Sequence, residues 1–130
     1  MKLLLDTHIW IWFLIGHPRL PQSLQIVIAE ETNELWLSPI SIWETLILAE
    51  KRKIILQQPP EIWIKQGLEL LKIQEAFLTN DIALLSRQLN LVHQDPADRF
   101  IVATAVHYGL ILVTVDDNLI QASCVQTLSQ

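Results

Sequence analysis

The sequence predicts an α/β fold in which a short parallel sheet is covered by helices on both faces. Short apolar stretches, such as LLL at residues 3–5 and LILV at residues 110–113, alternate with longer segments bounded by helix signals. Strands that are apolar throughout are typical of a parallel sheet buried on both faces. The chain has 130 residues, of which 51% are hydrophobic, so we expect one domain over residues 1–130 with a core of its own.

The first half of the chain supplies the opening elements. Residues 2–5 form a buried strand, and the helix that follows ends at Gly16 and Pro18. Pro21 suits the first turn of a second helix, and a short strand at residues 35–37 leads into Ser38-Pro39, where a capping serine precedes a proline. These signals predict helices over residues 8–15, 21–31 and 39–53.

The second half repeats the alternation. Pro59-Pro60 breaks the chain and opens the next helix, and Asp95-Pro96 again places a capping residue before a proline. The last long helix ends before Gly109. We therefore expect helices over residues 60–73, 81–89 and 96–108, and strands over residues 76–78, 110–113 and 125–128.

Composition excludes several classes of protein. The apolar run at residues 9–15 is far below the roughly 20 residues needed to cross a bilayer, and no small-residue cleavage site follows it, so we expect neither a secretory leader nor a membrane segment. The single Cys124 excludes an internal disulfide and fits a cytoplasmic location, and we expect it as a buried thiol in a short strand. A formal net charge of −5 argues against broad binding to duplex nucleic acid.

Two aspartates come directly after predicted strands. Asp6 follows LLL, and Asp116 follows LILV in the stretch LILVTVDDN. Because ligands of parallel sheets bind beyond the carboxyl ends of the strands, this topology places both acids on the same edge. The plainer interpretation is an aspartate that caps the next helix. We expect Asp117 to take that capping role, which leaves Asp116 for another.

Two further acids lie in helices that are otherwise apolar. Glu44 stands in PISIWETLILA, which is apolar nearly all round and is therefore predicted to be buried, so Glu44 must be paired, protonated or bound to a metal. Asp98 is the third residue of a helix capped by Asp95, and an almost wholly apolar stretch follows it. Each acid has a structural alternative: a capping box from Ser41 to Glu44, or a favourable interaction of Asp98 with the helix dipole.

Four acids at the beginnings of helices or the ends of strands together predict a metal site. If they converge, like charges a few ångströms apart raise each other's pKa values, and a divalent cation removes that penalty. Oxygen ligands alone favour Mg²⁺ or Mn²⁺. The sequence carries neither a Gly-rich phosphate loop nor a serine nucleophile elbow, which excludes those two catalytic designs.

Four stretches give the chain a family resemblance: LLLDTHIWIW, LSPISIWE, HQDPADRFIVATA and LILVTVDDN. The chain resembles PIN-domain proteins, and most closely the VapC-type ribonuclease toxins of bacterial toxin–antitoxin pairs. The stretches lie in the family's order and span residues 3–118. The resemblance implies a PIN-like three-layer fold, with a short central parallel sheet between two layers of helices.

The resemblance also implies the site and the reaction. The metal-binding and catalytic acids would be Asp6, Glu44, Asp98 and Asp116. Residues that support them would be Thr7, Ser41, Asp95, Arg99, Thr114 and Asp117. The implied reaction is hydrolysis of an RNA phosphodiester by a water molecule activated on Mg²⁺ or Mn²⁺.

The implied partners are an RNA substrate, a cognate antitoxin whose tail blocks the site, and a second copy in a homodimer. The stretch IWIWFLI offers apolar side chains on every face of a short helix. Trp10 and Trp12 are two positions apart and cannot easily both face inward, so we expect one of them at the antitoxin interface. We expect Trp36 and Trp43 in the core.

Two other functions stay open. A phospho-acceptor signalling domain also binds Mg²⁺ at strand ends, but here the first strand ends in one acid rather than a pair, and the tail VQTLSQ offers no lysine. A non-catalytic interaction module would use the acids only as helix caps. That module predicts no dependence on cations and tolerance of the substitution Asp98→Asn.

Overall fold

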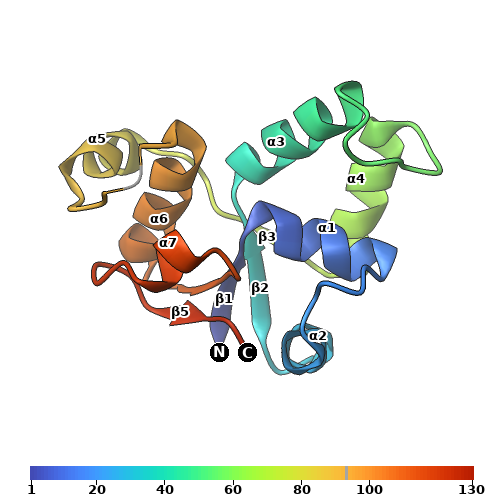
Figure 1. The fold of residues 1–130 in the computed structure, drawn as a ribbon, viewed down its shortest axis with the longest axis horizontal. Coiled ribbons are helices and arrows are strands. Elements are labelled where there is room, and N and C mark those ends of the chain that lie inside the picture. The colour runs from blue at the N-terminus through green and yellow to red at the C-terminus, as the bar shows by residue number, and fades with distance from the viewer. Residues whose placement is uncertain (93) are drawn as a thin grey trace.

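Five short parallel strands form the centre of the computed structural model, which describes residues 1–92 and 94–130 (Figure 1). Their order across the sheet is β3-β2-β1-β4-β5, and every pair of neighbours is parallel. The predicted parallel α/β architecture is therefore confirmed. The strands are β1 (Lys2–Leu5), β2 (Glu34–Leu37), β3 (Gln74–Glu75), β4 (Ile111–Val113) and β5 (Thr127–Leu128).

The central strand β1 is buried on both faces. Leu3, Leu4 and Leu5 are all 0% exposed, and Leu3 and Leu5 join one apolar cluster while Leu4 joins the other. Beyond the end of β1, the backbone N–H of Asp6 donates to the carbonyl of Val113 in β4 at 3.0 Å. The hydrogen-bond ladder therefore fixes Asp6 at the carboxyl edge of the sheet, beside the end of β4.

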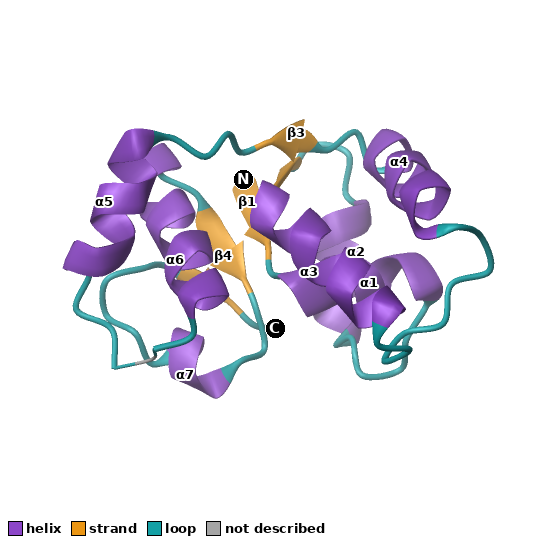
Figure 2. Cartoon of the chain, turned by 90° about the horizontal axis from the view of Figure 1, so that it is seen from above, coloured by secondary structure: helices purple, strands orange, loops and turns teal. Residues whose placement is uncertain are grey.

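Helices cover the two faces of the sheet as separate groups. Figure 2 shows α5, α6 and α7 gathered on one side of the strands and α1, α2, α3 and α4 on the other. This is the predicted three-layer arrangement, with one apolar cluster under each group of helices. The helices are α1 (Thr7–Ile15), α2 (Gln22–Ala29), α3 (Pro39–Glu50), α4 (Pro60–Leu70), α5 (Asn80–Gln88), α6 (Pro96–Tyr108) and α7 (Asp117–Ile120).

The capping signals predicted from the sequence are in place. The side chain of Ser38 accepts a hydrogen bond from the backbone N–H of Ile40 at 3.1 Å, so α3 begins at Pro39 and not at Ser41. Gly109 ends α6 in the left-handed conformation, with φ of 68°, which costs a residue without a side chain little. These local signals explain why the predicted helix starts are accurate to within a residue or two.

Three expectations about strands and the C-terminal segment are wrong. The strand expected at residues 76–78 lies at Gln74–Glu75, because α4 stops earlier than predicted, where Lys72 takes a positive φ of 52°. The last strand is shorter than expected and covers only Thr127–Leu128. Cys124 lies in a turn before it and is half-buried, so it is not the buried strand thiol that we expected.

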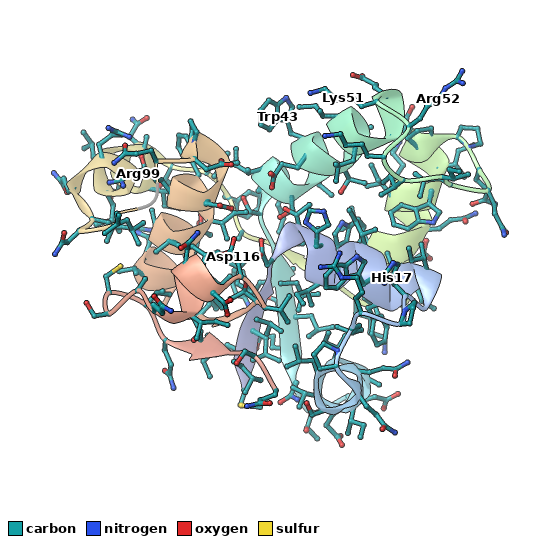
Figure 3. The ribbon with its side chains drawn as sticks, viewed as in Figure 1. His17, Trp43, Lys51, Arg52, Arg99 and Asp116 are labelled. Atoms are coloured by element: carbon teal, nitrogen blue, oxygen red, sulfur yellow. The ribbon has the colours of Figure 1, made fainter. Side chains whose placement is uncertain are left out.

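The expectation that α3 is buried all round is also wrong. Its buried residues are two polar ones, Ser41 and Thr45, and Trp43 is 56% exposed instead of lying in the core. The helix lies on the outside of the molecule, with Trp43 on its outer side (Figure 3). On the side that faces α1, Thr45 accepts a hydrogen bond from Trp10. Trp36 is partly buried as expected and packs on Tyr108, with ring centroids 5.4 Å apart.

Trp10 and Trp12 are both buried, so the expectation that only one of them could face inward is wrong. Trp10 is 0% exposed and meets Trp63 of α4 edge to face, and Gly67 lets α4 approach so closely that an added Cβ would lie 3.1 Å from the Trp10 ring. Trp12 is 9% exposed because residues of the loop after α1 cover it. The antitoxin interface expected at one of these two indoles stays a prediction.

No helix within residues 1–92 and 94–130 combines the length and hydropathy needed to cross a membrane.

Candidate active site

Asp6 stands where the central strand ends and α1 begins. One carboxylate oxygen, Oδ1, accepts the backbone N–H of Thr7 at 2.9 Å, and the other, Oδ2, accepts the hydroxyl of Thr114 at 2.7 Å. Thr114 follows β4 directly and is 0% exposed. Because β1 and β4 are neighbours in the sheet, residues 108 positions apart in sequence meet here, and both oxygens of Asp6 are held in place.

Thr114 also connects Asp6 to Asp116. Its hydroxyl oxygen accepts the backbone N–H of Asp116 at 3.1 Å while its hydrogen is donated to Asp6. Asp116 caps α7, with Oδ1 accepting the backbone N–H of Asn118 at 2.9 Å. The expectation that Asp117 would be the cap is therefore wrong. Asp116 is the residue with extended backbone, φ −74° and ψ 117°, and Asp117 is already the first residue of the helix.

Glu44 reaches this edge of the sheet from α3. Its Oε1 lies 2.5 Å from the hydroxyl oxygen of Thr7, which in turn lies 2.9 Å from the hydroxyl oxygen of Ser41. The Thr7 hydroxyl has one hydrogen, so when Glu44 is ionised Thr7 donates to Glu44 and accepts from Ser41. Thr7 follows Asp6 in the chain, so this contact ties the second acid to the first. Ser41 and Thr7 thus lie where the resemblance implies supporting residues.

The pKa values of Asp6 and Glu44 are both raised, and the charges of neighbouring acids contribute to both shifts. Burial is the largest influence on Asp6 and raises its pKa above 3.8, against the lowering effect of its hydrogen bonds to Thr114 and Thr7. Burial likewise raises the pKa of Glu44 above 4.5, against the hydrogen bond from Thr7. The charge of Asp116 further raises the pKa of Asp6, and the charges of Asp6 and Asp95 further raise that of Glu44. Negative charge at this edge is therefore disfavoured without a compensating cation.

His8 is a residue of this edge that the sequence reasoning missed. It is exposed as the second residue of α1, and its positive charge is among the influences that lower the pKa values of both Asp6 and Glu44. Its position two residues after Asp6, in a helix that starts at the edge of the sheet, is the signal that could have found it.

Two more of the predicted residues, Asp95 and Asp98, lie at the start of α6. Asp95 caps the helix as expected, accepting the backbone N–H groups of Ala97 at 2.9 Å and Asp98 at 3.3 Å. Asp98 is the third residue of α6 and half-buried, as the sequence predicts. The influence of Asp95 on Glu44 indicates that the start of α6 faces the site.

Arg99 is bound to backbone carbonyls around the end of α5. It is 4% exposed, and its guanidinium donates to the backbone carbonyls of Ser86 at 2.8 Å, Leu91 at 3.1 Å and Leu89 at 2.9 Å. In Figure 3 it lies toward α5, whereas Asp116 lies near the centre of the molecule. Arg99 therefore fixes the end of α5 and the segment that leads toward α6.

Two threonines connect three of the predicted acids by hydrogen bonds. Thr114 joins Asp6 with Asp116, and Thr7 joins Asp6 with Glu44. In the part of the chain that the structure describes, no three side chains of His, Cys, Asp or Glu are grouped closely enough to hold a metal ion. Thr114 and Thr7 thus bring three of the four predicted acids, Asp6, Asp116 and Glu44, together at the carboxyl edge of the sheet.

Comparison with known proteins supplies the family. A profile of the PIN domain matches residues 3–123. The chain belongs to the PIN domain family. It is 35% identical over 117 residues to Ribonuclease VapC22 of Mycobacterium tuberculosis, which covers 89% of this chain and 88% of that protein.

Solved PIN-domain structures share the fold of this chain. It superimposes with a TM-score of 0.70 on VapBC2 from Rickettsia felis bound to a promoter DNA fragment, at 17% identity and with 98% of both chains covered. The TM-score is 0.66 for VapBC-1 from nontypeable Haemophilus influenzae, at 18% identity, covering 99% of this chain and 98% of the other. The predicted family and the predicted PIN-like fold are both confirmed.

Proposed function

We propose that this PIN domain is a metal-dependent endoribonuclease that acts as the toxin of a toxin–antitoxin pair. The observation that carries the proposal is the hydrogen-bonded connection of Asp6 to both Asp116 and Glu44 at the carboxyl edge of the sheet. The relative at 35% identity bears the name of a ribonuclease, which supports the RNA substrate. One solved neighbour in the fold is a toxin–antitoxin complex from Klebsiella pneumoniae, and another belongs to the VapBC family of toxin–antitoxin systems, which supports a cognate antitoxin as partner.

The donor chemistry of the edge suits Mg²⁺ or Mn²⁺. All four acids offer carboxylate oxygens, and the raised pKa values of Asp6 and Glu44 are what a nearby divalent cation would lower. Asp6, Glu44, Asp98 and Asp116 would hold the ion. When bound, it supplies Lewis-acid chemistry: it makes a coordinated water more acidic and offsets charge on the leaving oxygen.

Other residues of the chain hold two of the acids in position. Thr114 orients Asp6, and the pair of hydroxyls on Thr7 and Ser41 orients Glu44. The protein is further proposed to be cytoplasmic and to pair with a second copy, and both proposals rest on the family alone.

Titration of the purified, antitoxin-free protein with Mn²⁺ by calorimetry tests the metal site. We expect saturable binding that Asp98→Asn abolishes. The matched control is Asp81→Asn, which removes the same charge from the first turn of α5 and should bind Mn²⁺ like the wild type. No binding by the folded wild-type protein would overturn the metallonuclease proposal and favour a non-catalytic interaction module.

Cleavage of single-stranded RNA in Mg²⁺ or Mn²⁺ tests the reaction. We expect Asp6→Asn and Glu44→Gln each to lower kcat by about a hundredfold or more, the loss typical of removing a group that stabilises the transition state. Activity that survives in EDTA, or in Asp6→Asn, would show that a contaminating nuclease or a different site does the cleavage.

A further inference from the structure

The exposed side of α1 and the loop after it carry a group of aromatic and cationic side chains that the metal chemistry does not use. We call this group the α1 stack. Its members are His8, Trp12, His17 and Arg19.

The α1 stack is a built arrangement and not a chance collection of surface residues. Trp12 is its centre, with the ring of His8 one helical turn earlier at a centroid distance of 5.7 Å. His17 lies nearly parallel to the indole, at 5.4 Å and 21°, and the guanidinium carbon of Arg19 lies 5.1 Å from the ring centroid. The turn is held by the His17 backbone N–H donating to the Trp12 carbonyl at 2.9 Å, and by the Arg19 backbone N–H donating to Nδ1 of His17 at 3.0 Å.

The sequence makes this turn with a single glycine. Gly16 takes φ of 68° and ψ of 37° at the end of α1, and its positive φ folds the chain back over the last turn of the helix. The fold-back is what places His17 and Arg19 against Trp12, which leaves the indole 9% exposed beneath them. His8 and Arg19 are exposed, and His17 is half-buried.

The α1 stack begins beside the acidic edge, by which we mean the carboxyl edge of the sheet where Asp6, Glu44 and Asp116 lie. His8 is the second residue of α1 and lies two residues after Asp6 in the chain. From that edge the helix runs outward for 9 residues, about 13 Å at the usual rise of roughly 1.5 Å per residue. At about 3.4 Å per stacked nucleotide, this length matches roughly four nucleotides.

Arg19 brings a positive charge to the α1 stack in a chain of net charge −5. Lys65 is paired with Glu61, and Arg99 is buried among backbone carbonyls. Lys51 and Arg52 lie at the far end of α3 from Ser38, on the outer part of the molecule (Figure 3). The positive charge of Arg19 therefore offsets part of the repulsion that the acidic edge exerts on an approaching phosphate chain.

We propose that the α1 stack binds the stretch of single-stranded RNA that flanks the bond cleaved at the acidic edge. The proposal rests on the proposed ribonuclease function and adds the surface that holds the substrate. Imidazole rings offer stacking faces for bases, and the guanidinium offers both a stacking plane and a positive charge for a phosphate. Trp12 acts as the buried support that keeps the other members in register.

The test compares Arg19→Gln and His17→Ala with Arg87→Gln, a control that removes one exposed positive charge from α5. Binding of a short fluorescein-labelled single-stranded RNA is followed by anisotropy in EDTA, and KM and kcat are measured in Mn²⁺. We expect the two stack variants to weaken binding and to raise KM by about three- to tenfold, with kcat within about twofold of wild type. Arg19→Gln should also lower the salt dependence of binding by about 0.7 in the log–log slope, and Arg19→Lys should restore that slope.

Unchanged RNA affinity in both stack variants, with the fold intact by circular dichroism, would overturn the proposal. So would an equal loss in Arg87→Gln, because that would indicate attraction by net charge alone, and so would the absence of RNA binding by the wild type. A loss of antitoxin binding without a loss of RNA binding would assign the stack to a protein partner instead. If the stack variants cleave RNA as the wild type does, the ribonuclease proposal holds and the RNA-binding role of the α1 stack is wrong. If the stack binds RNA but the protein cleaves none, the RNA-binding role holds and the ribonuclease proposal is wrong.

Discussion

Helices α1 and α3 have similar sequences and opposite environments. Both are apolar along almost their whole length, THIWIWFLI in α1 and PISIWETLILAE in α3. In α1 the buried positions are mainly large apolar residues, and Trp10 is 0% exposed. In α3 the buried positions are Ser41 and Thr45, and the large ring of Trp43 is 56% exposed.

The difference comes from what each helix packs against. α1 lies against the sheet and is covered by α4 and by the loop after α1, so apolar contact is available on nearly every side. α3 touches α1 through a polar seam, in which Thr7 meets Ser41 and Glu44 and Trp10 donates to Thr45 at 3.1 Å. Half-buried Ile42, Leu46 and Leu48 of α3 also pack against the apolar core. The hydrogen bonds of the seam fix the direction of the Glu44 side chain more closely than this apolar packing alone would.

Trp10→Ala is expected to cause the largest loss of stability among the changes that probe this comparison. It removes a fully buried indole, an edge-to-face contact with Trp63 and a hydrogen bond to Thr45. Truncation of a buried Trp costs about 3–5 kcal/mol of unfolding free energy. Urea unfolding measures the loss, and a cost below about 1 kcal/mol would contradict the central position that the structure gives to this residue.

Thr45→Val tests the polar seam from the α3 side. It leaves the buried Nε1–H of Trp10 without its acceptor, so we expect a loss of about 1–3 kcal/mol in the free energy of unfolding, despite the nearly equal volume of the two side chains. Thr45→Ser keeps the hydroxyl and serves as the control, and we expect it to lose less free energy of unfolding than Thr45→Val. Equal stability of Thr45→Val and the wild type would show that the hydrogen bond contributes nothing to the packing of α1 on α3.

The contrast between α1 and α3 also shows which features the sequence can predict. Strand LLL, the caps Ser38 and Asp95 and the terminator Gly109 are local signals, and the elements that they predict are present. Which side of an apolar helix meets a neighbour depends on residues distant in sequence, so the exposure of Trp43 was not predictable from the pattern of α3. The same holds for Trp12, which is covered by a loop that turns back at Gly16.

In the candidate site too, local patterns and sheet topology predict some features, while others depend on residues distant in sequence. Asp6 and Asp116 were placed correctly at one edge because the topology of parallel sheets puts all carboxyl ends together. The choice between Asp116 and Asp117 as helix cap depends on where β4 stops and on the hydrogen bond from the Asp116 backbone N–H to Thr114. Two adjacent aspartates carry no pattern that distinguishes them. Arg99 shows the same limit, since its carbonyl partners belong to α5 and the following loop.

The pH dependence of stability tests the electrostatic account of the acidic edge in the metal-free protein. The pKa of Asp6 is raised above 3.8 in the folded state, chiefly by burial, so the unfolded chain loses this proton at lower pH than the folded chain. The contribution of Asp6 to stability is therefore full below about pH 3.8 and falls as pH rises through its folded pKa. Asp6→Asn lacks this titration, so in EDTA its Tm should rise relative to that of the wild type as pH increases from about 4 toward 7.

Glu44→Gln should show the same sign, because burial raises the pKa of Glu44 above 4.5. Asp81→Asn, at the exposed start of α5, is the control for the loss of one negative charge. Mn²⁺ should reverse the order at neutral pH by stabilising the wild type and not Asp6→Asn. If the difference in Tm between Asp6→Asn and the wild type stayed constant across the pH range, the assignment of a raised pKa to Asp6 would be contradicted.

Trp43→Ala is expected to have the smallest effect, although it removes the same side chain as Trp10→Ala. With 56% of the residue exposed, the free energy of unfolding should change by no more than about 0.5 kcal/mol. The measurement is urea unfolding at several protein concentrations, beside Trp10→Ala. A loss that approaches that of Trp10→Ala would mean that this face of α3 is buried in solution. If such a loss grew with protein concentration, a second copy of the chain would be what covers it, because only an associated state makes stability depend on concentration.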